Sequence, residues 1–374
     1  MKELTIIGSL ITDQEYSHNK IILKALKNCG WGIKDCSIRT IKISPKLPFF
    51  LRLLGMIGII PLQWMLIFFK YILSHPAEVL FIPYPVHANA PLIWLLSRFG
   101  DKTIIIDAFF GLYDTIVNDR GLVKSGGLIA RVIYRYEKWL FSSVDIVLLD
   151  TPVHSRRVRH EMGITTTRIE HVPVGIDESI WYPAAPNQNE DEFRVLFWST
   201  FIPLHGVEVI AHAAKLIEAH DPKIQFTVIG TGQLAPTFKK LLEELQPSNL
   251  RWIHGFISMA EIRQHVEASH CCLGIFGKSA KADSVIPYKV HQTLAAGRPL
   301  ITAATRASTY YLKDGEHSIL IAPGNPRALA EAIRNLKKDP ALVTRIGRNG
   351  RRLYEQQFSN QVIVDKLQNL LATL

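Results

Sequence analysis

Short apolar runs alternate along the chain with longer stretches in which apolar residues recur at helical spacing. Four runs in the first half are apolar throughout, at residues 4–7, 79–82, 103–106 and 146–149. Continuous apolar character is typical of strands that are covered on both faces, as in a parallel sheet. The first half therefore predicts a series of βαβ units.

The pattern stops in a polar stretch at 183–192 and then begins again. A second set of buried strands is predicted at 194–198, 225–229, 271–276 and 299–302, with helices at 206–219, 234–245 and 328–337. Two such series predict an α/β protein of two doubly wound, Rossmann-like domains that face each other across a cleft. Ligands in such sheets bind beyond the carboxyl ends of the strands, so the cleft is the expected site.

The composition agrees with a globular protein of two domains. The chain has 374 residues, of which 48% are hydrophobic and 20% charged, so neither a disordered nor a fibrous chain fits. Its four cysteines form no C-x-x-C pair and no Cys/His cluster with zinc spacing, which indicates a reducing compartment and no structural metal. The start of the chain resembles a buried strand and lacks the long apolar region of a secretory signal.

The formal net charge of +10 indicates an acidic partner. Residues 1–75 hold ten basic and four acidic side chains and also the most apolar stretch, 47–73. That stretch has two interpretations: buried helices, or an in-plane attachment to an anionic membrane with Arg52 and Lys70 at the headgroups. The basic helical run with Arg131, Arg135 and Lys138 is either a solvated face or a membrane-facing patch. No helix-turn-helix, RNP or zinc-finger pattern supports a nucleic-acid partner.

Two small-residue turns follow predicted strands. Gly8-Ser9 follows the first strand, where a small residue lets a ligand approach the backbone, although an ordinary turn explains it equally well. Gly230-Thr231-Gly232 repeats the arrangement but is not a full dinucleotide fingerprint, and no acidic residue follows it at the spacing for NAD. This pattern disfavours a hydride-transfer enzyme.

A denser arrangement lies at 276–301. Pro287 suits the first turn of a helix and Gly297 its C-terminal cap. Free amides at that N-terminus, with Lys289 one turn in, would bind a diphosphate. Gln292 shares the helix face of Lys289 and could hydrogen-bond a hydroxyl.

Four motifs, in order and spacing, resemble one family. They are Val172-Pro173-Val174-Gly175-Ile176-Asp177, Phe201-Ile202-Pro203-Leu204-His205-Gly206-Val207-Glu208, Val228-Ile229-Gly230-Thr231-Gly232 and Leu294-Ala295-Ala296-Gly297-Arg298-Pro299. Through them the chain resembles the retaining glycosyltransferases of family 4, which have the GT-B fold. The resemblance implies an acceptor-side domain at 1–175, a nucleotide-sugar domain at 176–355, and a terminal helix at 356–374 that packs back on the first domain.

The family implies metal-independent transfer of a sugar from a UDP- or GDP-sugar, with no cofactor, and the chain contains no D-x-D motif. The donor-binding residues implied by the resemblance are Gly8, Ser9, Thr200, His205, Gly206, Gly230, Gly232, Gly255, Phe256, Ile257, Lys289 and Gln292. Two departures stand out: the family's donor-loop Arg and Lys align with Thr200 and His205, and its paired glutamates with Ser284 and Gln292. We expect Lys289 to replace the missing cations, with Lys278, Lys281 and Arg306 as further candidates.

Asp107 falls at a strand end, near where many family members place a His. As a catalytic residue its carboxylate could orient or deprotonate an acceptor hydroxyl, although a strand-end aspartate that caps a turn is the alternative. The remaining acceptor-side candidates are Tyr16, Asn19, Asp114, Asp119 and Arg120.

The sequence thus predicts a retaining glycosyltransferase that acts on a glycan or lipid-linked acceptor in cell-surface polysaccharide or glycolipid synthesis. We expect it to be cytoplasmic and peripheral at the inner face of the cell membrane. Two alternatives stay open: a nucleotide-sugar epimerase on the same fold, and a non-catalytic nucleotide-sugar binder.

Overall fold

A computed structural model describes residues 2–11, 17–40, 49–98, 101–185 and 191–374, and within these the side chains of 49–58 are not described. The chain divides into two compact units. Unit 1 comprises residues 1–113, 126–175 and 363–374, and unit 2 comprises 114–125 and 176–362. The prediction assigned 114–125 to the first domain, whereas the structure packs this segment with unit 2.

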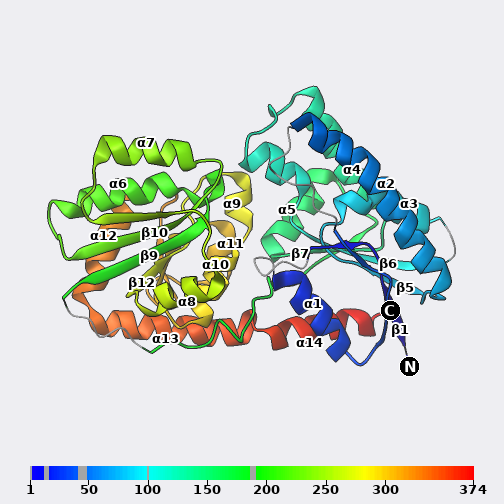
Figure 1. The fold of residues 1–374 in the computed structure, drawn as a ribbon. Coiled ribbons are helices and arrows are strands. Elements are labelled where there is room, and N and C mark those ends of the chain that lie inside the picture. The colour runs from blue at the N-terminus through cyan, green and yellow to red at the C-terminus, as the bar shows by residue number, and fades with distance from the viewer. Residues whose placement is uncertain (1, 12–16, 41–48, 99–100, 186–190) are drawn as a thin grey trace. The chain divides into compact units, whose positions relative to one another are not determined.

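Unit 1 is built on a six-stranded parallel sheet with the strand order β3-β1-β5-β6-β7-β8 (Figure 1). The strands are β1 (Glu3–Ile6), β3 (Gly32–Asp35), β5 (Val79–Ile82), β6 (Thr103–Phe109), β7 (Ile146–Leu149) and β8 (Arg168–His171). A separate two-stranded sheet pairs β2 (Ser9–Leu10) with β4 (Ile38–Arg39). The helices are α1 (Ser17–Asn28), α2 (Phe49–Leu73), α3 (Ala90–Leu96), preceded by η1 (His87–Asn89), α4 (Leu128–Ser142) and α5 (Pro152–Met162).

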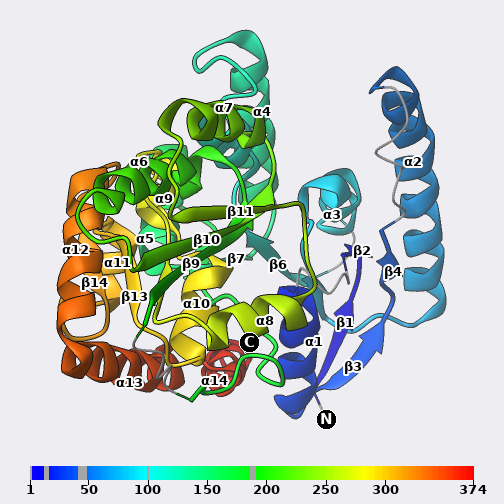
Figure 2. The same cartoon turned by 60° about the vertical axis from the view of Figure 1, so that its left-hand side comes forward.

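Successive side chains of the central strands enter two different cores, because neighbours in a strand point to opposite faces. In β5, Val79 and Phe81 pack with α1, whereas Leu80 and Ile82 pack with α2, α3 and α4. Figure 2 shows α1 on one side of β1 and α2 on the other. This double coverage explains why β5 and β7 are buried at every position.

Unit 2 repeats the plan with the strand order β11-β10-β9-β12-β13-β14. Its strands, all parallel, are β9 (Phe193–Thr200), β10 (Ile224–Thr231), β11 (Leu250–His254), β12 (Cys271–Leu273), β13 (Leu300–Ala303) and β14 (Ile319–Ile321). Its helical elements are η2 (Asp114–Asp119), η3 (Pro203–His205), α6 (Val207–Glu218), α7 (Ala235–Leu245), α8 (Met259–Glu267), α9 (Ala280–Ser284), α10 (Tyr288–Ala295), α11 (Arg306–Tyr311), α12 (Pro326–Lys338) and α13 (Pro340–Gln357). The main core lies where α6, α7 and α12 cover one face of this sheet.

The last helix, α14 (Asn360–Ala372), begins with residues of unit 2 and continues with residues of unit 1. Ile363, Leu367, Leu370 and Leu371 are buried in the same core of unit 1 as α1. The two parallel sheets with helices on both faces confirm the predicted α/β fold class.

No helix of the described residues is both long enough and apolar enough to cross a membrane.

Candidate donor site in unit 2

The loop between β9 and α6 comprises residues 201–206 and fixes the orientation of His205. Gly206 has a φ of +62°, and a Cβ atom there would lie 2.8 Å from the backbone nitrogen of Gly277, so a larger residue would displace the neighbouring loop. The Nδ1 atom of His205 lies 2.5 Å from the carbonyl oxygen of Thr200. Because a carbonyl can only accept, Nδ1 carries the proton and Nε2 keeps its lone pair.

Buried positive charge surrounds His205. Burial lowers the pKa of His205 well below its usual value, and the nearby charges of Lys289, Lys281 and Arg120 lower it further, against the hydrogen bond to Thr200. His205 is therefore neutral in this structure. At a position where the resemblance predicts a donor-loop cation, the chain has a neutral imidazole with cations near it.

Lys289 lies in the first turn of α10 and points into the protein. It is 4% exposed, and its Nζ atom lies 3.8 Å from the centre of the Phe197 ring. Nζ has no hydrogen-bond partner among the described residues. Burial lowers the pKa of Lys289 well below its usual value, because a buried ammonium without a counterion is unfavourable.

Gln292 is oriented by a tryptophan that the sequence did not single out. The indole nitrogen of Trp198 lies 3.2 Å from Oε1 of Gln292. An indole N–H can only donate, so the amide oxygen of Gln292 faces Trp198 and its NH2 group faces away. Trp198 in turn stacks on Trp181, with ring centres 6.2 Å apart. Gln292 is thus held as a hydrogen-bond donor at a position where the resemblance predicts a carboxylate, which can only accept.

The other donor candidates lie at the carboxyl ends of the neighbouring strands β10 and β11. A Cβ atom on Gly230 would lie 1.9 Å from the carbonyl oxygen of Ser199, so close packing alone requires glycine there. Gly232 has a φ of +151° and Gly255 a φ of +109°. Phe256 is 62% exposed, and Ile257 is half-buried beside it. An exposed aromatic ring at this edge is available to contact a flat ligand.

The segment 114–125 brings further charged groups to unit 2. Asp119 accepts a hydrogen bond from Ser279 at 3.0 Å, and Lys281 donates to Thr115 at 2.9 Å. Burial raises the pKa of Asp119, an effect that the nearby Lys281 partly offsets. Asp114, which is buried, and Arg120 belong to the same segment. Three residues predicted on the acceptor side, Asp114, Asp119 and Arg120, therefore lie in the unit that carries the donor candidates.

The other two candidate cations, Arg306 and Lys278, lie at the protein surface. Arg306 is exposed to solvent and pairs with Asp283, which is half-buried. Lys278 is exposed, and its side chain lies against Gly324. Of the four candidates, Lys289 and Lys281 are the two whose charges lower the pKa of His205.

Asp107 of unit 1 is buried and accepts a hydrogen bond from a histidine. The Nε2 atom of His18 lies 2.9 Å from a carboxylate oxygen of Asp107. The Nδ1 atom of His18 accepts from the backbone N–H of Gly175, and Ser17 donates to the carbonyl oxygen of Gly175. The His18 ring stacks on Phe109, with ring centres 4.6 Å apart. Asp107 therefore fixes a side chain that holds Gly175, the last residue of the 126–175 segment of unit 1. No local pattern in the sequence pairs Asp107 with a histidine 89 positions away.

The remaining candidates of unit 1 are enclosed. Gly8 has a φ of +123°, and Ser9 shares hydrogen bonds with the side chain of Asn89. The side-chain nitrogen of Asn19 donates to two backbone carbonyl oxygens. Tyr16 lies outside the described residues.

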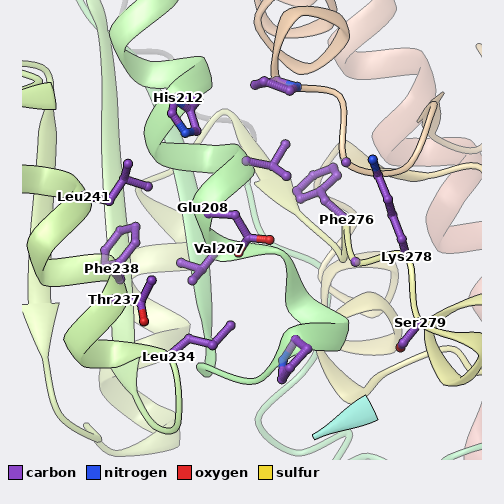
Figure 3. A pocket seen from close by; sticks show the side chains of 15 residues that line it. Val207, Glu208, His212, Leu234, Thr237, Phe238, Leu241, Phe276, Lys278 and Ser279 are labelled. Atoms are coloured by element: carbon purple, nitrogen blue, oxygen red, sulfur yellow. The ribbon is translucent and has the colours of Figure 1, made fainter. Parts of the chain in front are cut away.

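A pocket of about 680 Å³ adjoins the donor loop on the side of α6 and α7 (Figure 3). Its walls are mainly apolar, with Val207 from α6, Phe238 and Leu241 from α7, and Phe276 opposite them. Lys278 is among its polar lining residues. Of the described residues that line it, none is Thr200, His205, Lys289 or Gln292, so the pocket is separate from the cationic cluster around His205.

Solved structures share the fold of the whole chain. A sucrose-phosphate synthase from Thermosynechococcus elongatus matches with a TM-score of 0.77 and 17% identity, covering 100% of this chain and 99% of that one. Anabaena HepE, in complex with UDP-glucose, matches with a TM-score of 0.69 and 11% identity over 100% of both chains. These similarities, together with the two parallel sheets, define the fold as GT-B.

Comparison with known sequences indicates the class of enzyme to which residues 182–353 are similar. Residues 182–353, a little under half of the chain, match the family described as Glycosyl transferases group 1, so this part of the chain is similar to the group 1 glycosyltransferases. EpsD of Bacillus subtilis (strain 168) is 23% identical over 249 residues, which are 63% of this chain and 63% of that protein. The lipopolysaccharide core biosynthesis glycosyltransferase LpsE of Rhizobium meliloti (strain 1021) is 22% identical over 48% of this chain and 49% of that protein. The chain thus spans about half to two thirds of the length of these relatives.

Proposed function

We propose that this protein is a retaining glycosyltransferase that moves a sugar from a UDP- or GDP-sugar to a glycan or lipid-linked acceptor in cell-surface polysaccharide or glycolipid synthesis. One observation carries the proposal: the charges of Lys289, Lys281 and Arg120 lie near the neutral His205. Such a concentration of buried positive charge fits a diphosphate. The names of relatives such as LpsE support the polysaccharide assignment.

In the proposed reaction, an acceptor hydroxyl oxygen forms a bond to the anomeric carbon of the donor sugar. The bond between that carbon and the diphosphate oxygen breaks, the nucleoside diphosphate leaves, and the hydroxyl proton is released. Negative charge develops on the leaving diphosphate, so fixed cations and amide dipoles lower the barrier. The N-terminus of α10 and Lys289 supply these groups.

Lys289 contacts the diphosphate only if its side chain rotates away from Phe197, because Nζ is enclosed in this structure. The NH2 group of Gln292 then donates to a ribose oxygen, and Phe256 with Ile257 covers the base. Gly230, Gly232 and Gly255 let the backbone approach the ligand. These roles follow from the position of each residue at the carboxyl edge of the sheet of unit 2.

On the acceptor side, we assign Asp107 to the acceptor hydroxyl, either directly or through His18. The hydrogen bonds of His18 to Asp107 and Gly175 favour a positioning role. Asn19 and Tyr16 are the other candidates of unit 1.

The membrane is the second proposed partner, through the segment 47–73. In its described part, α2 carries a stripe of exposed apolar side chains on one helix face: Leu62, Met65, Leu66, Phe69, Ile72 and Leu73. The same helix packs against unit 1 through Ile67 and Tyr71. An exposed apolar stripe of this length fits in-plane attachment at the inner face of the cell membrane.

The proposal is tested by incubating the purified protein with a panel of UDP- and GDP-sugars, with and without glycan acceptors. We expect slow donor hydrolysis, and transfer when the acceptor fits, with the anomeric configuration of the product, read by NMR, the same as in the donor. Release of an epimerised free sugar would favour the epimerase instead. Binding of UDP or GDP without any turnover would favour the non-catalytic binder, and no binding at all would contradict the proposal.

A further inference from the structure

The exposed face of α4 in unit 1 combines apolar and basic side chains. Leu128, Ile129 and Val132 are 78%, 62% and 58% exposed. Arg131, Arg135 and Lys138 are exposed on the same helix, whereas its one acidic side chain, Glu137, is fully buried. A helix with this exposed composition is typical of the interface between water and anionic lipid.

Between the two arginines the surface is hollowed. A pocket of about 200 Å³ is lined by Tyr113, Gly126, Ala130, Arg131, Tyr134 and Arg135. Arg131 and Arg135 are four positions apart, so their side chains leave the helix from the same face. Neither forms an ion pair with a described residue. Two free guanidinium groups beside one hollow match the geometry of a phosphate group.

The tyrosines of the hollow are held in place. The rings of Tyr113 and Tyr134 meet edge to face, with centres 5.7 Å apart. The hydroxyl of Tyr134 donates to the backbone carbonyl of Glu161. The aromatic walls of the hollow are therefore in place before any ligand arrives and do not need to reorganise on binding.

Aromatic side chains extend the surface toward α3. The rings of Trp94 and Trp139 lie 6.4 Å apart, and both side chains are more than one third exposed. The guanidinium of Arg98 lies 5.3 Å from the Trp94 ring. Tryptophan and arginine are favoured at the headgroup level of membranes. In Figure 1, α2, α3 and α4 lie together on one side of unit 1.

We propose that the hollow between Arg131 and Arg135 binds the headgroup phosphate of an anionic membrane phospholipid, while Leu128, Ile129 and Val132 insert among the acyl chains. We choose an anionic phospholipid as the occupant because the exposed face of α4 is basic and the headgroup phosphate is negatively charged. The proposal rests on the proposed membrane attachment, to which it adds a second contact besides the α2 stripe. It does not depend on the transferase activity.

The test measures sedimentation of the full-length protein with vesicles of phosphatidylcholine, with and without phosphatidylglycerol, at low and at high salt. The first variant is Arg131→Gln/Arg135→Gln. A matched control, Lys239→Gln/Lys240→Gln, removes the same charge from the exposed face of α7 in unit 2. Each basic residue near an anionic surface strengthens partitioning about fivefold, so the α4 variant should bind phosphatidylglycerol vesicles about 30-fold more weakly, and the control like wild type.

Three further results decide the proposal. High salt should reduce wild-type binding strongly, because the headgroup charge is then screened. Glycerol 3-phosphate in solution should not compete; competition would make the hollow a site for small free anions and overturn the membrane assignment. Wild-type binding by the α4 variant, or equal losses in the α4 variant and the control, would also overturn it.

A second variant separates the two membrane contacts. Leu66→Ser/Phe69→Ser removes apolar surface from α2 alone. If only this variant loses binding, attachment through α2 stands and the α4 site is wrong. If wild type itself ignores every vesicle, both are wrong, and the transferase proposal is unaffected because its assay uses soluble donors.

Discussion

Replacing Lys289 by methionine should stabilise the empty protein and weaken donor binding. The Nζ atom is enclosed without a hydrogen-bond partner, which costs about 1–3 kcal/mol. Its position over the Phe197 ring returns at most about 2 kcal/mol. Methionine has a similar length and keeps a favourable contact with the ring, worth about 0.3–1.5 kcal/mol. The free energy of unfolding should therefore stay constant or rise by about 1 kcal/mol.

The same substitution removes a charge-assisted hydrogen bond to the diphosphate. Such bonds contribute about 1.5–3 kcal/mol, so the affinity for UDP or GDP should fall roughly 10- to 150-fold. Stability and binding then move in opposite directions. A lysine with a purely structural role cannot produce this combination.

Two measurements check this. Thermal unfolding without ligand should show a melting temperature equal to that of wild type or raised by about 2–4 °C, as expected for about 1 kcal/mol in a unit of this size. Titration calorimetry with UDP and GDP gives the affinities. Lys240→Met, at a side chain that is 78% exposed, is the control and should change neither quantity. If Lys289→Met melts several degrees lower and binds both nucleotides like wild type, the proposed phosphate contact is refuted.

Three other predictions concern the side chains around these groups. Trp198→Phe frees the amide of Gln292 to flip, so calorimetry should show reduced discrimination between UDP and 2′-deoxy-UDP; unchanged discrimination would contradict the positioning by Trp198. Asp107→Asn keeps an acceptor for His18 and should retain most of kcat if Asp107 positions, whereas a loss of about 100-fold or more in transfer assays would indicate proton transfer. Finally, the pKa of His205 is lowered in the folded state, so the unfolded state binds more protons below about pH 6.5. The free energy of unfolding should therefore decrease by up to about 1.4 kcal/mol for each unit by which the pH is lowered below that value. His205→Asn should flatten this slope in denaturant titrations at several pH values.

The sequence predicted the fold in detail where strands are covered on both faces. The predicted runs 79–82 and 146–149 coincide with β5 and β7. The edge strands β3, β8, β11 and β14 were not predicted, because they are only partly buried and so have no continuous apolar run. The predicted strand at 271–276 ends early, at Leu273, and beyond it the backbone N–H groups of Phe276 and Gly277 donate to the carbonyl oxygens of His205 and Leu204.

The site was less predictable for a physical reason. Helical spacing placed Lys289 and Gln292 on one face of α10, but their surroundings come from β9, which lies more than ninety positions earlier. Phe197 and Trp198 decide what these two side chains can do, and nothing local in the sequence pairs them. The same holds for 114–125, whose packing against α9 depends on residues such as Lys281 that are far along the chain.

The basic character of the chain has two physically different forms. Around His205 the positive charge is largely enclosed, and burial lowers the pKa of His205 itself and of Lys289. On α4 the side chains of Arg131 and Arg135 are exposed to solvent. Salt should therefore weaken vesicle binding far more than UDP binding, because screening acts on exposed charges and much less on buried ones. If both fall in parallel as salt rises, the division of the charge into a buried donor cluster and an exposed membrane face is wrong.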